Sequence, residues 1–202
     1  MNYLAHFHLA DSDNDGLLVG ALLGDYIKGP LKGDWPASWE QGIHLHRQID
    51  AFSDRHPLSR QFRQQLPPTF RRYSGIMLDV VCDHFLSRQW QQFHPQPITD
   101  FSQRIYQLFD SDTTIPASAR QRIASFARHD VLSAYSDWRT IDTALAHIGE
   151  RLRHDNPLRD AGKTLLSHYT GLEKLFTAFY PEVIDFADAV RRIAKCPERQ
   201  RN

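Results

Sequence analysis

Cysteine is scarce in this sequence, and long apolar runs are missing. Cys82 and Cys196 are the only cysteines among 202 residues, and no Cys-x-x-Cys motif occurs, so both are expected to be reduced thiols. The longest apolar run, residues 16–24, is shorter than the roughly 20 residues that a membrane span needs, and the first ten residues lack the basic start of a signal peptide. We therefore expect a cytoplasmic protein that does not bind a membrane.

The sequence also has no net charge at pH 7 when histidine is counted as neutral. The 24 lysines and arginines balance the 24 aspartates and glutamates, so a charged partner must be recognised through a local patch. Within each sign the usage is uneven, with 19 Asp against 5 Glu and 19 Arg against 5 Lys. Aspartate is a poorer helix former than glutamate, and arginine is suited to binding phosphate through two parallel hydrogen bonds. These biases favour phosphate chemistry.

Helical periodicity runs through the chain, whereas convincing strand-like alternation is absent. With 41% hydrophobic and 24% charged residues, the composition is that of an ordinary globular domain. We predict one all-α, multi-helix domain over residues 1–202, with a flexible basic tail at about 196–202. The predicted helices are Tyr3–Leu9, Asp15–Ile27, Ala37–Asp54, Leu58–Gln65, Thr69–Phe93, Asp100–Phe109, Ala117–Ser133, Trp138–Arg153, Ala161–Phe179 and Glu182–Lys195.

Several familiar enzyme motifs are absent. Gly-x-Ser-x-Gly, the Walker loop, Gly-x-Gly-x-x-Gly and His-Glu-x-x-His do not occur, which leaves metal-assisted hydrolysis as the chemistry to consider. Two adjacent His-Asp pairs resemble ligands of metal phosphohydrolases. We interpret both as unrelated to a site, because His129-Asp130 lies in a mostly polar stretch and His154-Asp155 precedes an Asn-Pro turn.

The apolar segment 76–90 carries two carboxylates on one helical stripe. Asp79 and Asp83 lie one turn apart among Ile76, Val80 and Leu86. Burying two unpaired carboxylates at that spacing would be costly. A metal ion, an arginine from another helix or a shared proton must therefore compensate them.

A second segment, residues 42–54, repeats this pattern. His46, Asp50 and Asp54 follow one another at i, i+4 and i+8, and a histidine nitrogen and a carboxylate oxygen one turn apart can chelate one ion. Asp25 ends a helix rich in glycine and leucine, whose small residues allow close approach to a packed site. His6 is either a satisfied core histidine or part of the same cluster.

Several segments together resemble a known family. They are Met1–His6, Gly24–Gly29, Gly42–Asp50 and Leu78–Arg88, with His168-Tyr169 and Phe179–Pro181 extending the likeness over nearly the whole chain. The sequence resembles the acyl carrier protein phosphodiesterases, distant relatives of the His-Asp metal-dependent phosphohydrolases. The resemblance implies the fold of that superfamily, a manganese-type cofactor, and removal of 4′-phosphopantetheine from holo acyl carrier protein. One departure is the order Asp83-His84, since the superfamily places His before Asp.

We therefore predict a cytoplasmic, metal-dependent phosphodiesterase of fatty acid and lipid metabolism. The predicted metal ligands are Asp25, His46, Asp50, Asp79 and Asp83, whose oxygen donors favour Mn²⁺ over zinc, with Mg²⁺ or Fe²⁺ as alternatives. His6 and His84 are predicted to position the attacking water or to protonate the leaving serine oxygen. Arg47 and Arg88 are predicted to clamp the phosphate oxygens. Docking of the acidic carrier is predicted at Lys28, Lys32, Arg55, Arg60 and Arg63.

Two other functions fit the same residues. A nucleotide or nucleic-acid phosphohydrolase would use the same cluster, but the sequence lacks a basic groove interleaved with aromatic residues, so no nucleic-acid partner is expected. A non-catalytic helical binding module would pair its buried carboxylates with arginines. Stoichiometric metal separates the module from both enzymes. The sequence does not indicate an oligomeric state.

Overall fold

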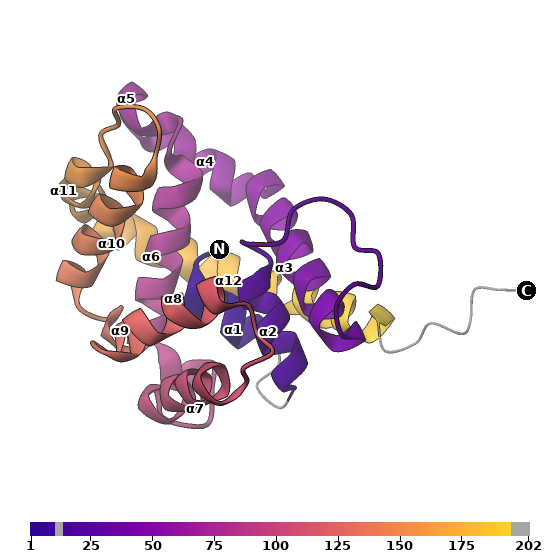
Figure 1. Cartoon of the computed structure of the whole chain (residues 1–202). Coiled ribbons are helices and arrows are strands. Elements are labelled where there is room, and N and C mark those ends of the chain that lie inside the picture. The colour runs from indigo at the N-terminus through magenta and orange to yellow at the C-terminus, as the bar shows by residue number, and fades with distance from the viewer. Residues whose placement is uncertain (11–13, 195–202) are drawn as a thin grey trace, which may run out of the picture.

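Residues with helical spacing of apolar side chains form helices along almost all of the described chain. The structure is a computed structural model that describes residues 1–10 and 14–194, and the predicted basic tail lies outside them. Within these ranges it contains helices and no strand, which confirms the all-α class (Figure 1). None of the described helices has the length and apolar character needed to cross a membrane.

The α-helices are α1 (Tyr3–Leu9), α2 (Asp15–Leu23), α3 (Ala37–Arg55), α4 (Pro57–Gln65), α5 (Pro68–Arg71), α6 (Ser74–Arg88), α7 (Ile98–Ser111), α8 (Ala117–Ala127), α9 (Val131–Ala134), α10 (Trp138–Arg151), α11 (Ala161–Ser167) and α12 (Tyr169–Ala194). Two 3₁₀ helices, η1 (Trp90–Gln92) and η2 (Leu158–Asp160), complete the described elements. The first helix has the bounds that the sequence predicted.

The breaks between helices differ from the predicted ones at several places. The predicted helix 69–93 is interrupted at Tyr73 and Gln89, where the backbone leaves the helical region. The predicted helix 117–133 breaks at Asp130, which has a left-handed φ of 42°. The predicted break at Pro181 is wrong, because α12 continues through it. The proline removes one helical hydrogen bond, whereas continuation buries Phe179 and other core side chains around it.

The α1 helix lies at the centre of one continuous apolar core. It contacts α2, α6 and α12, and its Leu4, Ala5 and Phe7 side chains are buried. In Figure 1 the α2–α3 connection lies on one side of the N-terminus and α6 and α10 lie on the other. The first residues of the chain therefore lie beside α3 and α6, the two helices in which the sequence predicted carboxylate clusters.

Helices α2 and α3 cross at two glycines. A Cβ atom on Gly20 would lie 2.2 Å from the carbonyl oxygen of Trp39, and one on Gly42 would lie 2.5 Å from that of Leu17. Real Cβ atoms do not approach so closely, so only glycine permits this crossing. The close approach predicted from the small residues of α2 is confirmed, and it brings the end of α2 against α3.

Candidate metal centre

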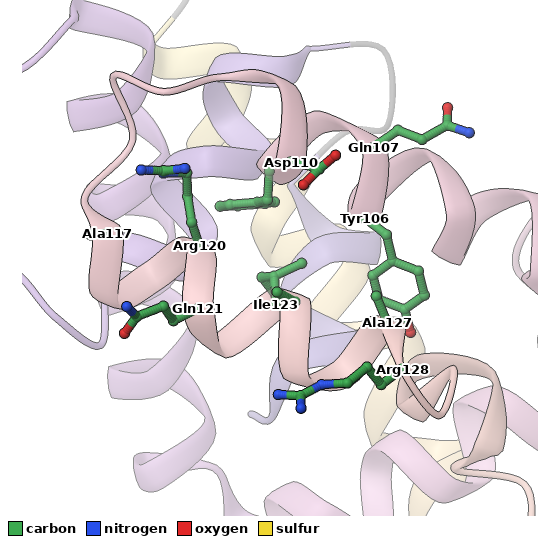
Figure 2. Close-up of a pocket in the computed structure, with 11 residues that line it drawn as sticks. Tyr106, Gln107, Asp110, Ala117, Arg120, Gln121, Ile123, Ala127 and Arg128 are labelled. Atoms are coloured by element: carbon green, nitrogen blue, oxygen red, sulfur yellow. The ribbon is translucent and has the colours of Figure 1, made fainter.

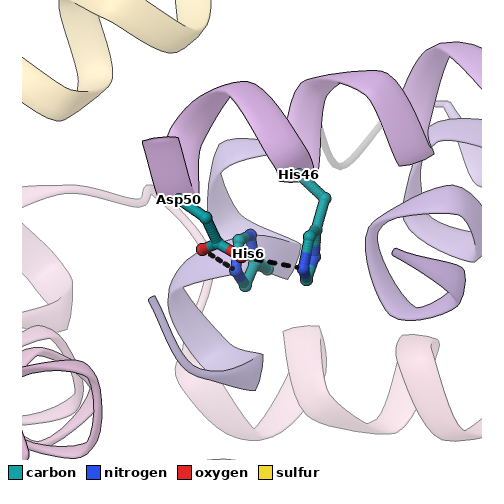
Figure 3. Close-up of side chains that lie close together, drawn as sticks. All are labelled: His6, His46 and Asp50. Atoms are coloured by element: carbon teal, nitrogen blue, oxygen red, sulfur yellow. Dashed lines mark hydrogen bonds and ion pairs between the residues drawn. The ribbon is translucent and has the colours of Figure 1, made fainter. Parts of the chain in front are cut away.

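Three side chains from α1 and α3 converge on one point (Figure 3). His46 and Asp50 lie one turn apart on α3, and α1 brings His6 beside them. The Nε2 atom of His6 lies 3.1 Å from Oδ1 of Asp50, and Nε2 of His46 lies 3.2 Å from Oδ2. The two imidazoles stack with a centroid separation of 3.8 Å. One ligand atom from each residue lies within 4.8 Å of the others, which is the spacing of a metal site.

The orientation of His46 is fixed by the backbone of α2. Its Nδ1 atom donates to the carbonyl oxygen of Ala21 at 2.7 Å, and its side chain is buried. The Nε2 atom then faces two carboxylates, at 3.2 Å from Asp50 and 3.6 Å from Asp25. A ring nitrogen between two carboxylates is stabilised by a positive charge at that point, which either a proton on the ring or a bound metal ion supplies. A backbone carbonyl holding the far nitrogen is the arrangement that orients histidine ligands of metals.

The side chain of His6 is buried, and in the described part of the chain only one of its two ring nitrogens contacts a polar partner. Burial first, and then the neighbouring His46, lower the pKa of His6 to about 3, so its ring is neutral at physiological pH. Its Nδ1 atom is buried without a hydrogen-bond partner within the described residues. A neutral imidazole with an unpartnered nitrogen suits a metal ligand better than a proton donor.

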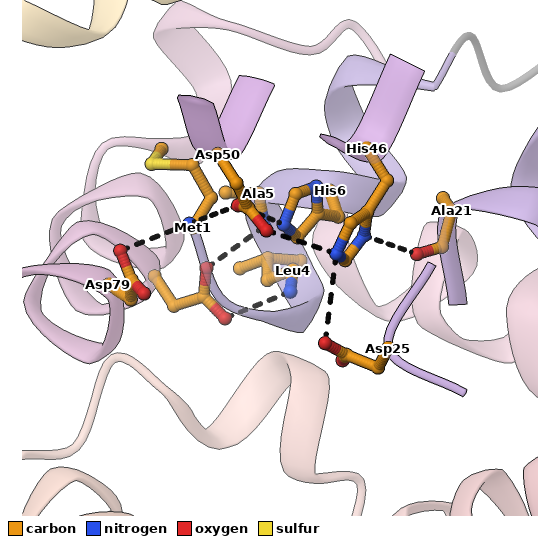
Figure 4. A network of polar contacts seen from close by, with 10 residues as sticks. Met1, Leu4, Ala5, His6, Ala21, Asp25, His46, Asp50 and Asp79 are labelled. Atoms are coloured by element: carbon orange, nitrogen blue, oxygen red, sulfur yellow. Dashed lines mark hydrogen bonds and ion pairs between the residues drawn. The ribbon is translucent and has the colours of Figure 1, made fainter. Parts of the chain in front are cut away.

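The amino group of Met1 lies between carboxylates of α3 and α6 (Figure 4). It donates to Oδ1 of Asp50 at 2.9 Å and lies 3.0 Å from Oδ1 of Asp79. Burial alone would lower the pKa of this amine, but the two carboxylates raise it to about 11. Burial raises the pKa of Asp79, and the amine opposes that shift. The compensating charge that the sequence required for Asp79 is therefore a main-chain amine and not an arginine.

Comparison with known proteins identifies the family of this chain. A model of the acyl carrier protein phosphodiesterase family matches residues 1–183. This chain belongs to that family. The acyl carrier protein phosphodiesterase of Klebsiella pneumoniae (strain 342) is 34% identical over 193 residues, which span 93% of this chain and 98% of the relative. The protein of the same name from Escherichia coli O6:H1 is 35% identical over 192 residues, which span 93% and 97%, and that from Yersinia pestis is 34% identical over 186 residues, which span 91% and 96%.

Family membership confirms the resemblance drawn from the sequence motifs. No solved structure matches the chain, so kinship with the fold of the His-Asp phosphohydrolases stays a prediction. The residues that the sequence predicted for the site divide into those that the structure brings to the centre and those that it does not.

Asp83 does not join the centre as a predicted ligand. Its side chain is fully buried, and its two oxygens accept hydrogen bonds of 2.9 Å from the backbone amides of Leu4 and Ala5. These amides lie in the first turn of α1, where a helix offers them no carbonyl partner. Burial raises the pKa of Asp83 to about 7, and the two amides oppose the shift. Asp83 therefore caps α1, and we do not retain it as a ligand.

His84 and Arg88 also lie away from the cluster. The Nδ1 atom of His84 donates to the carbonyl oxygen of Tyr135 at 2.8 Å. Burial lowers the pKa of the ring, so its Nε2 atom accepts from the hydroxyl of Tyr169 at 3.0 Å. Arg88 is exposed at the end of α6, near the same Tyr169. The two hydrogen bonds of His84 are structural, and neither His84 nor Arg88 belongs to the three-residue cluster.

Arg47 lies at the centre but is already engaged. Its guanidinium donates to the carbonyl oxygens of Ile27 at 2.7 Å and Gly29 at 2.8 Å, and so ties the segment that carries Asp25 to α3. With Lys28 it lines a cavity of about 320 Å³ beside His46. The other predicted docking residues are exposed and line none of the three cavities described: Lys32, Arg55, Arg60 and Arg63.

Two larger cavities lie outside the cluster. One, of about 930 Å³, reaches from Asp25 and Asp79 into the space between α8 and α10. The other, of about 570 Å³, lies between α7 and α8 and is lined by Tyr106, Asp110 and Arg120 among others (Figure 2). The second contains no predicted site residue. The first borders the centre, and sequence reasoning missed it.

Both literal His-Asp pairs lie outside the three-residue cluster. His129 is exposed and borders the large cavity, whereas the carboxylate of Asp130 accepts from the hydroxyl of Tyr106 at 3.0 Å. His154 and Asp155 are exposed beyond the end of α10.

We expect Gly24→Ala to displace the ring of His46. A Cβ atom at this position would lie 2.3 Å from Cγ of His46, whose ring is held by Ala21. Overpacking of this kind costs about 1–3 kcal/mol, which lowers the melting temperature by roughly 2–12 °C in a protein of this size. Thermal unfolding measures the effect, with Gly171→Ala as the control because nothing lies within 4 Å of its added methyl group. Equal melting temperatures for the two variants would contradict the expected clash.

Proposed function

We propose that this protein is a metal-dependent phosphodiesterase that removes 4′-phosphopantetheine from holo acyl carrier protein and leaves the apo carrier. The names of its relatives support the substrate. The observation that carries the metal dependence is the orientation of His46, whose Nε2 atom faces the carboxylates of Asp25 and Asp50. Beside it, His6 has a buried nitrogen without a partner.

The donors at this centre fit a divalent cation. His6, His46 and Asp50 would hold it, with Asp25 and Asp79 flanking them. This mixture of imidazole and carboxylate ligands suits Mn²⁺, with Mg²⁺ or Fe²⁺ as alternatives. When bound, such an ion polarises a phosphate oxygen and makes a water molecule nucleophilic at neutral pH.

The surrounding residues organise the centre. The carbonyl of Ala21 holds His46 in one tautomer, and the two oxygens of Asp50 contact both imidazoles. Burial of Asp50 would raise its pKa, but His46, His6 and the Met1 amine hold it below its ordinary value, so this carboxylate stays ionised. Arg47 fixes the segment that carries Asp25. The reacting phosphodiester would thus meet a site whose ligands are held before it arrives.

Chelation tests this proposal directly. Purified protein treated with excess chelator and dialysed is expected to lose its action on holo acyl carrier protein, and added Mn²⁺ is expected to restore it, because the nucleophile depends on the ion. Intact-mass spectrometry of the carrier measures the loss of its phosphopantetheinyl group. Full turnover in excess chelator would overturn the metal dependence. A protein that neither binds stoichiometric metal nor cleaves the carrier would instead be the non-catalytic helical module.

A further inference from the structure

Several arginines line the cavity of about 930 Å³ beside the metal centre, and none of them was predicted from the sequence as a site residue. One end is bordered by Asp25 and Asp79. The remainder is lined by residues of α8 and α10. In Figure 1, α10 lies on the side of the N-terminus opposite the α2–α3 connection. Its volume lies within the range of about 300–1,000 Å³ that small-molecule sites occupy. We call it the α8–α10 cleft.

One side of α10 supplies a regular polar stripe to this cleft. Arg139, Thr143, His147 and Arg151 follow one another at intervals of four residues, and all four line the cleft. Such spacing places side chains above one another on one helical face. The four-residue spacing is visible in the sequence. Its relation to the metal centre follows only from the structure, in which α10 packs against α6 and lines the same cleft as Asp79.

Arg139 of the cleft pairs with Asp137 at 3.2 Å, whereas the other arginines that line it are available to a ligand. Among residues 1–10 and 14–194, no carboxylate lies within ion-pair distance of Arg122, Arg128 or Arg151. Glu150, the acidic lining residue distant from the metal centre, pairs with Arg159 at 3.1 Å and is thereby offset. The cleft away from Asp25 and Asp79 therefore carries a net positive charge, which attracts an anionic group.

Two of these arginines line the cleft together with Tyr3 and Asp25. Burial first raises the pKa of Tyr3 to about 12, the charge of Asp25 adds to that shift, and the charges of Arg122 and Arg151 oppose it. All three charged residues are thus close to the Tyr3 hydroxyl. Tyr3 also packs edge-on against Phe126, with ring centroids 4.9 Å apart, so apolar surface adjoins the two guanidiniums.

We infer that the α8–α10 cleft holds the 4′-phosphopantetheine arm of the carrier protein, with Arg122 and Arg151 binding its phosphate. This inference rests on the proposed function. It replaces Arg47 and Arg88 as the phosphate-binding pair. The hydroxyls of Ser125, Thr140 and Thr143 line the cleft and match the hydrogen-bonding amides of the arm, while Phe126 and Ile148 offer apolar contacts to its methyl groups. The arm has two amides and a pair of methyl groups beyond its phosphate, and the lining of the cleft offers a chemical partner for each of these groups.

Binding of free 4′-phosphopantetheine to the Mn²⁺-loaded protein, measured by calorimetry, tests the inference without turnover. Arg122→Ala and Arg151→Ala are each expected to raise the Kd, and the KM for holo carrier, by about 10- to 100-fold, since each removes a charge-assisted hydrogen bond. Arg153→Ala is the matched control, because Arg153 is exposed just beyond α10 and does not line the cleft. Ala144→Phe fills the cleft without changing its charge and is expected to weaken binding about tenfold or more.

The outcomes separate this inference from the proposed function. If the wild type converts holo to apo carrier while Arg122→Ala, Arg151→Ala and Ala144→Phe bind the arm normally, the cleft is not its site and the function stands. If binding depends on Arg122 and Arg151 but no carrier is cleaved, the cleft stands and the function fails. A raised KM only in the double variant Lys28→Ala, Arg55→Ala would overturn the inference in favour of the docking surface predicted from sequence.

Discussion

Asp50→Asn is expected to lower activity on holo acyl carrier protein by about 1,000-fold or more while leaving the protein folded. The Asp50 carboxylate contacts His6, His46 and the Met1 amine, so it joins both histidines of the cluster to the N-terminus. Asparagine has the same size but no charge, and its NH₂ group cannot ligate a metal. In the proposed mechanism, losing this ligand would remove the ion that makes water nucleophilic and stabilises the transition state.

Asp54→Asn is the matched control for this variant. Asp54 lies one turn further along α3, is exposed, and stands outside the three-residue cluster. Steady-state turnover and metal content measure the primary effect. Thermal unfolding adds a second readout, because Mn²⁺ at 100 times its Kd stabilises the folded state by about 2.7 kcal/mol. The melting temperature of the wild type and of Asp54→Asn should rise with Mn²⁺, and that of Asp50→Asn should not. An Asp50→Asn variant with more than a tenth of wild-type turnover would remove Asp50 from the site.

Asp83→Ala is expected to destabilise the fold by about 3–5 kcal/mol, because it leaves two buried amides without acceptors and empties the cap of α1. This is a large share of the 5–15 kcal/mol that stabilises a typical domain. Urea unfolding followed by circular dichroism measures the loss. Asp83→Asn retains one carbonyl oxygen that can accept from Leu4 or Ala5, and is expected to lose roughly half as much.

The structural role of Asp83 and its predicted ligand role have opposite consequences. A ligand would be crowded against Asp79 in the apo protein, so its removal would leave the fold intact and abolish metal binding. A wild-type unfolding midpoint for Asp83→Ala, together with absent metal, would therefore restore the sequence-based assignment.

The parts of the site that were predictable are those that one helix determines. The i, i+4 spacing of His46 and Asp50 placed both on one face of α3, where the structure has them. Residues 3–9 were predicted with the correct bounds. His6 was ambiguous because its place beside His46 depends on how α1 crosses α3, which no single-helix pattern contains.

The incorrect predictions for the site have a common physical origin, because main-chain groups supply the partners of these side chains. Asp79 and Asp83 were expected to need a metal, an arginine or a shared proton, but the Met1 amine contacts Asp79 and two backbone amides donate to Asp83. Every chain carries these groups, so composition and spacing cannot reveal where they will be used. His84 was misassigned for a related reason, since one of its two partners is a backbone carbonyl more than fifty residues away along the chain.

The hydrogen bonds from Leu4 and Ala5 to Asp83 also limit how long the cluster of His6, His46 and Asp50 can persist. These bonds hold the first turn of α1 to α6, and His6 is the next residue along the same helix. Any local opening that frees those two amides for exchange with solvent also withdraws His6 from His46 and Asp50. The lifetime of the intact centre therefore cannot exceed the lifetime of the docked first helix.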